Sequence, residues 1–85
     1  MNVIVNANSD KEMYRSFLDI FPELEGKCRG HRTFKWDDRV RKILIDLKGS
    51  KMQILFSVRK DEDTDTWDQF SALLIPADQS YGEAK

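Results

Sequence analysis

The sequence has few of the residues that usually form catalytic, metal-binding or nucleotide-binding sites. Among its 85 residues there is one cysteine, Cys28, and one histidine, His31. A single cysteine excludes an intrachain disulfide, whereas small secreted domains usually depend on several. The four glycines are scattered, which excludes the glycine-rich loops that cradle phosphates in nucleotide-binding proteins. We therefore expect no cofactor and a reducing, cytoplasmic location.

Long apolar runs are absent as well. The longest, residues 72–75, is far shorter than the roughly 20 residues that a membrane-spanning helix needs. The first residues show no basic stretch followed by an apolar run, so we expect no signal peptide. Hydrophobic residues make up 40% and charged residues 34%, which is typical of a small globular domain. We expect residues 1–78 to form one domain without a membrane partner, and residues 79–85 to form a flexible C-terminal tail.

Two short patterns resemble parts of metal-binding sites but lack the other ligands that such sites need. Cys28 and His31 have the spacing of a zinc-ligand pair, yet structural zinc normally takes four Cys or His ligands. Asp61, Asp63 and Asp65 resemble the start of a calcium loop, but threonine and alanine stand where that loop needs glycine and glutamate. We expect no metal site. A Cys28 nucleophile beside His31 is the enzymatic alternative, although we expect no enzyme.

The first part of the chain predicts a strand followed by a helix. Residues 2–6 form a short β-branched run that favours a strand. Ser9 and Glu12 have the spacing of a capping box, which marks the start of a helix, and Pro22 is expected to end it. The apolar face of this helix is formed by Met13, Tyr14, Phe17, Leu18, Ile20 and Phe21. Their helical spacing indicates that this face packs on the rest of the domain.

The middle of the chain predicts a β-hairpin that turns at Gly49 and Ser50. Glycine suits the first position of a two-residue type II′ turn because that position requires a positive φ. Such a turn would pair Leu47 with Met52, Ile45 with Ile54 and Ile43 with Phe56 on one face, and Asp46 with Gln53, Leu44 with Leu55 and Lys42 with Ser57 on the other. Residues 40–47 also contain helical spacing, but a helix would leave Ile45 in water. We therefore favour the hairpin.

The remaining segments complete an α+β fold. We expect a connector over 23–32, a short strand over 33–36, a turn at Asp37 and Asp38, and an acidic loop over 60–66. Residues 67–75 fit a helix or a strand, and we favour an antiparallel strand because a lone hairpin needs a neighbour. The predicted fold is an N-terminal strand and helix packed on an antiparallel β-meander centred on the hairpin. Its predicted core is Met13, Phe17, Ile20, Ile43, Ile45, Met52, Ile54 and Phe56.

Charge is segregated along the sequence, although the overall net charge is only −1. Residues 1–25 carry a net charge of −3, residues 26–60 carry +8 and residues 61–85 carry −6. The last block suits docking to a basic protein surface because complementary charge raises the association rate. We expect a protein-binding module, such as an inhibitor, immunity-type or accessory protein, and a homodimer is an open alternative. Its predicted contact residues are Asp61, Glu62, Asp63, Asp65, Trp67 and Asp68.

The basic block supports an alternative function in nucleic-acid binding. Residues 27–42 place cations among aromatic residues, which is the combination that neutralises phosphates and stacks on bases. The predicted contacts of this alternative are Arg29, Arg32, Lys35, Trp36 and Arg39. The net charge argues against it, because nucleic-acid-binding domains are usually strongly basic.

Overall fold

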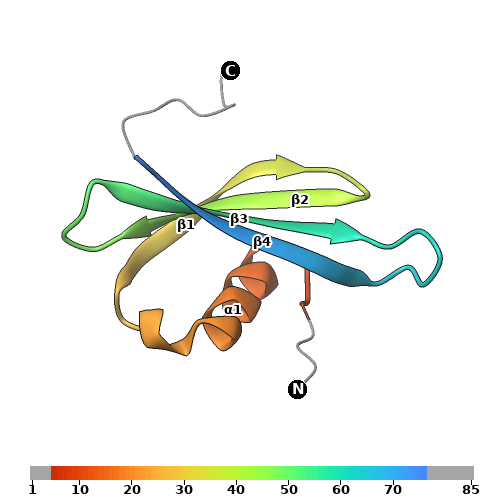
Figure 1. The fold of residues 1–85 in the computed structure, drawn as a ribbon, viewed down its shortest axis with the longest axis horizontal. Coiled ribbons are helices and arrows are strands. Elements are labelled where there is room, and N and C mark those ends of the chain that lie inside the picture. Colours follow the sequence, from red (N-terminus) through yellow and green to blue (C-terminus); the bar gives the residue numbers. More distant parts are fainter. Residues whose placement is uncertain (1–4, 77–85) are drawn as a thin grey trace.

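One helix packs against one face of a four-stranded antiparallel sheet in this computed structural model, which describes residues 5–76 (Figure 1). The elements are α1 (Asp10–Ile20), the short 3-10 helix η1 (Pro22–Leu24), β1 (Cys28–Trp36), β2 (Val40–Leu47), β3 (Met52–Lys60) and β4 (Trp67–Pro76). The strand order is β1-β2-β3-β4, so β1 and β4 are the two edges. The predicted α+β class is confirmed. Within residues 5–76, no helix is long and apolar enough to cross a membrane.

Helix α1 begins and ends where the sequence predicts. The Ser9 hydroxyl accepts a hydrogen bond from the Glu12 backbone N–H at 3.1 Å, and Pro22 follows the last helical turn. Met13 and Phe17 are fully buried. Residues 2–4 of the predicted N-terminal strand lie outside the described residues, as does the predicted tail at 79–85. Val5 is buried beside α1 but is not part of a strand.

The β2–β3 hairpin has the predicted register. Ile45 is opposite Ile54, Ile43 is opposite Phe56, and Lys42 is opposite Ser57. Gly49 has a φ of +65°, the positive value that the turn was expected to require. The strands end at Leu47 and Met52, so the connecting loop covers 48–51 and is longer than the predicted two-residue turn.

Strand β1 is longer than predicted, whereas β4 was predicted correctly. β1 begins at Cys28, so residues 28–32 are not part of a connector. Its register shifts between Cys28 and Gly30 and again between Thr33 and Lys35, and these bulges break the alternation by which a strand is identified. Gly30 has a φ of +151°, which glycine tolerates better than other residues. At the other edge, β4 pairs with β3 from Trp67 to Pro76, with one register shift beside Arg59 and Lys60.

The sheet separates two apolar clusters. On the helix-covered face, Phe17 of α1 packs on Phe56 of β3 with ring centroids 5.1 Å apart, surrounded by most of the predicted core. Ile20 and Met52, also expected in the core, are only partly buried. The opposite face, called the open face below, has a smaller cluster made by Leu44, Leu55, Ile75 and Phe34. No described helix covers the open face (Figure 1).

Candidate functional site

The acidic loop, residues 61–66, is held together by Asp61. The Asp61 backbone N–H donates to the Thr66 carbonyl at 2.8 Å, and the Asp65 N–H donates to the Asp61 carbonyl at 2.9 Å. The Asp61 carboxylate accepts the Asp63 N–H at 2.7 Å. This last bond is the main reason why the pKa of Asp61 lies below its usual value. Asp61 therefore has a structural role in the loop.

Other predicted protein-binding residues are also engaged within the molecule. Glu62 lies 3.2 Å from the Arg39 guanidinium, and Asp65 lies 3.0 Å from the Lys60 ammonium. Within the described residues, Asp63 and Asp68 form no ion pair. The structure does place the predicted acidic residues together, at the point where the chain enters β4. Asp63 and Asp68, which have no ion-pair partner within residues 5–76, therefore leave negative charge at the N-terminal end of an edge strand.

The predicted nucleic-acid residues do not share one surface. By register, Arg32 and Lys35 lie on the open face, opposite Leu44 and Lys42 of β2. Trp36 lies on the helix-covered face, and Arg39 points to the acidic loop through its ion pair with Glu62. Arg29 is exposed within the first bulge of β1. The bulges in β1 explain this division, because each one changes which residues face the same side.

Both tryptophans pack on a single arginine. The Arg41 guanidinium carbon lies 4.5 Å from the Trp36 ring centroid and 4.6 Å from that of Trp67. The Arg41 side chain also donates to the Asp37 carbonyl at 3.1 Å. Cation–π contacts of this kind join residues from both edge strands. Trp36 and Trp67 thus stabilise one end of the sheet, where Trp67 is partly buried and Trp36 remains 37% exposed.

Cys28 has the wrong environment for an activated nucleophile. Burial raises the pKa of its thiol, whereas a nucleophilic cysteine needs a lowered one. The His31 ring stacks on Tyr14 at 4.4 Å, and its Nε2 lies 3.8 Å from the Asp10 carboxylate. Within the described residues, no group of three or more His, Cys, Asp or Glu side chains is placed to hold a metal ion.

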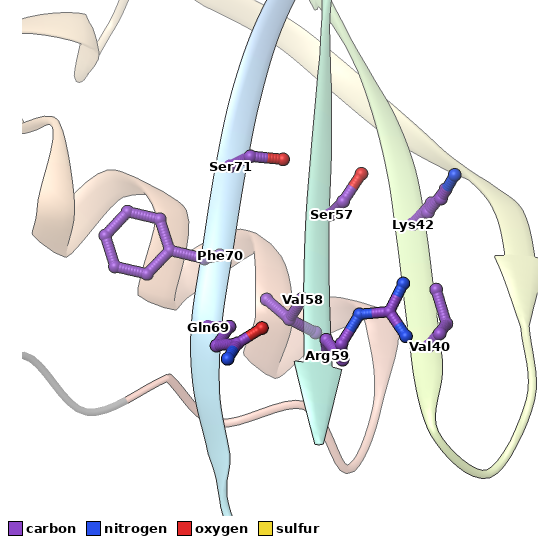
Figure 2. A pocket seen from close by; sticks show the side chains of 8 residues that line it. All are labelled: Val40, Lys42, Ser57, Val58, Arg59, Gln69, Phe70 and Ser71. Carbon is purple, nitrogen blue, oxygen red and sulfur yellow. The ribbon is translucent and has the colours of Figure 1, made fainter. Parts of the chain in front are cut away.

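The open face has a polar half that sequence analysis did not identify as a site. A shallow depression of about 270 Å³ lies across β2, β3 and β4 (Figure 2). Its lining residues are Val40, Lys42, Ser57, Val58, Arg59, Gln69, Phe70 and Ser71. Lys42, Ser57 and Ser71 project to the same side of the sheet, whereas Phe70 projects to the other (Figure 2). The predicted hairpin register had already placed Lys42 beside Ser57 on this face, which was the one indication of its polar character in the sequence.

The free edge of β4 is the second surface that sequence analysis missed. Within residues 5–76, β4 pairs only with β3, so its outer backbone groups have no partner strand. Three large apolar side chains on β4 are exposed: Phe70 at 41%, Leu73 at 50% and Leu74 at 57%. By register, Phe70 and Leu74 lie on the helix-covered face and Leu73 on the open face. The strand thus presents apolar groups on both sides of an unpaired edge.

Comparisons with known proteins give no indication of the function. No protein-family model matches the chain, and searches of curated proteins and of solved structures find no match either.

Proposed function

We propose that this chain is a non-enzymatic protein-binding module that takes up an extended segment of a partner as an additional strand on β4. The observation that carries the proposal is the outer edge of β4, which has no partner strand within residues 5–76 and along which Phe70, Leu73 and Leu74 are exposed. A long apolar edge strand is a template for pairing with another chain. Many peptide-binding domains use this mode, in which backbone hydrogen bonds give affinity and side-chain contacts give specificity.

The negative charge at the start of β4 determines which kind of partner segment the strand can bind. Residues 61–76 contain five carboxylates and no lysine or arginine, and the carboxylates lie at the N-terminal end of β4. A strand that pairs antiparallel would bring its C-terminal end to that position. The proposed occupant is therefore an extended segment with alternating apolar residues and lysine or arginine at its C-terminal end. A second copy of β4 fits less well because it has no cation to bring to the acidic end.

The proposal keeps the acidic residues as contacts but changes their role. Asp63 and Asp68, which form no ion pair within the described residues, attract the basic end of the partner and fix its direction. The apolar part of β4 supplies the contact area. Such a module suits an inhibitor or an accessory protein, and its lone cysteine suits the cytoplasm.

Selection from a random library of displayed peptides, each about as long as β4, tests this function. The full chain is immobilised, and the same library is selected in parallel on the Leu74→Lys variant. We expect the wild-type chain to enrich peptides with alternating apolar residues and a basic C-terminal end, and the variant to enrich none of them. An Asp63→Lys, Asp68→Lys double variant should lose the preference for a basic end but keep the apolar alternation.

Three results would reject the proposal. The wild-type chain could enrich no peptide, the Leu74→Lys variant could enrich the same peptides, or the basic residues could be selected without apolar alternation. Circular dichroism of each variant ensures that a lost signal does not come from unfolding. Leu74 is exposed, so its replacement by lysine is expected to change the free energy of unfolding by less than about 0.5 kcal/mol.

A further inference from the structure

Three cations on the open face lie along one diagonal of the sheet. Arg32 of β1 is opposite Leu44 of β2, and Lys42 lies two residues from Leu44 on the same face. Lys42 is opposite Ser57 of β3, and Arg59 lies two residues further along β3. Diagonal neighbours in a sheet are about 7–8 Å apart. The three cations therefore form a line of about 15 Å that crosses three strands.

These cations have no acidic partners within the described residues. Arg32, Lys42 and Arg59 form no ion pair there. The one carboxylate that the register places on the open face of β2 and β3 is Asp46, which accepts a hydrogen bond from Gln53 at 2.7 Å. Uncompensated cations in a row are a common feature of surfaces that bind polyanions.

Hydroxyl groups lie beside the diagonal. Lys35, Lys42, Ser57 and Ser71 are successive partners across β1, β2, β3 and β4, so they form one row on the open face. Figure 2 shows Lys42, Ser57 and Ser71 on the same side of the sheet, and all three line the depression. Serine hydroxyls donate hydrogen bonds to phosphate oxygens, as they do in many protein–DNA interfaces.

We infer that the open face binds the backbone of a single-stranded nucleic acid, with successive phosphates contacting Arg32, Lys42 and Arg59. Charges spread over about 15 Å fit several linked phosphates better than one phosphate ion. A duplex would present two backbones separated by a groove. The cations of this face that form no ion pair within residues 5–76 follow one line.

The same surface indicates binding without base preference. Phe34, the aromatic side chain on the open face of β1, packs on Leu44, Leu55 and Ile75. Trp36 lies on the other face against Arg41. The proposed contacts are therefore to phosphates, which carry no sequence information. The affinity for nucleic acid is therefore electrostatic and should fall steeply as the salt concentration rises.

Fluorescence anisotropy with labelled oligothymidylate and oligoadenylate tests the inference on the full chain. Three phosphate contacts predict that the logarithm of the association constant falls with the logarithm of the salt concentration with a slope of about −2. Lys42→Gln and Arg59→Gln should each reduce the magnitude of that slope by about 0.7 and weaken both oligonucleotides equally. Lys51→Gln, which removes the same charge from the β2–β3 loop, is the matched control and should leave the slope unchanged.

Several outcomes would overturn the inference. They are an absence of binding at low salt, an equal loss in Lys51→Gln, tighter binding of a duplex, and competition by inorganic phosphate beyond that of chloride at equal ionic strength. The result is independent of the function proposed for β4, because Lys42→Gln and Arg59→Gln leave the outer edge of that strand unchanged. Peptide selection should therefore succeed with both variants.

Discussion

The two edge strands of the sheet differ in the features that keep an edge from pairing with another strand. β1 carries Arg29, Arg32 and Lys35 and contains two bulges. β4 has one charged residue, Asp68, and one register shift, beside Arg59 and Lys60, and both lie at its N-terminal end. The rest of β4 carries no charge and exposes Phe70, Leu73 and Leu74. Charges and bulges are the usual means of protecting an edge. Within residues 5–76, β1 is therefore protected along its length, whereas β4 beyond Asp68 has no such feature. This contrast supports the assignment of partner binding to β4.

The largest expected effect compares two phenylalanines on the same face of neighbouring strands. Phe56 of β3 is fully buried against Phe17, whereas Phe70 of β4 is 41% exposed. Phe56→Ala should lower the free energy of unfolding by about 3–5 kcal/mol because it leaves a cavity in the core. Phe70→Ala should cost about 1 kcal/mol because much of its ring already contacts water. Urea denaturation measures both, and equal losses would mean that β4 is as fully packed as β3.

An intermediate effect is expected when a cation of the kind that protects β1 is introduced into β4. Leu74→Lys should weaken binding of a selected peptide at least tenfold, which corresponds to about 1.4 kcal/mol. The matched change on the other edge is Arg29→Thr, which removes a cation from β1 but leaves both bulges in place. It should not alter peptide affinity. Isothermal titration calorimetry gives both values, and an equal effect of the two changes would show that peptide binding does not distinguish the edges.

The smallest effect is expected in the acidic loop that leads into β4. Asp61→Ala should lower the melting temperature at pH 7 by a few degrees, because the Asp61 carboxylate accepts the backbone N–H groups of Asp63 and Thr64 within the loop. Asp63→Ala is the control, since its side chain makes no hydrogen bond or ion pair within the described residues. Thermal unfolding of both variants, followed by circular dichroism, gives the comparison.

The effect at Asp61 should depend on pH in a defined direction. Its pKa is lowered in the folded protein, chiefly by the Asp63 backbone N–H. The stabilisation from the carboxylate is therefore present above its unfolded pKa of about 3.9 and is lost as the pH falls through the lower folded value. The difference between the wild-type chain and Asp61→Ala should shrink below pH 4. A difference that grows on acidification would contradict this role.

Much of the fold could be predicted because several residues give strong local signals. Ser9 and Pro22 mark the ends of α1, and Gly49 sets the register of the β2–β3 hairpin. The predicted strand over 33–36 was shorter than β1 because the two bulges of β1 interrupt the alternation of apolar and polar residues. A bulge forms where the partner strand requires it, so its position depends on contacts between strands and is not visible in one segment alone.

The candidate surfaces were harder to predict than the fold. The acidic and basic blocks are visible in the sequence, but the ion pairs of Arg39 with Glu62 and of Lys60 with Asp65 appear only when the strands are assembled. Likewise, Arg32 and Arg59 are 27 residues apart and meet on one face only through the strand register. Phe70 and Leu74 fit a core pattern, and their exposure follows from the edge position of β4.

Hydrogen–deuterium exchange with and without a selected peptide is the most direct test of the account. If a partner segment pairs with β4, the outward-facing amides of residues 69–75 should exchange more slowly in the complex, because they gain hydrogen bonds to the added strand. The amides of β1 should exchange at the same rate in both states. Protection that appears on β1, or only in the acidic loop, would contradict the assignment of partner binding to the β4 edge.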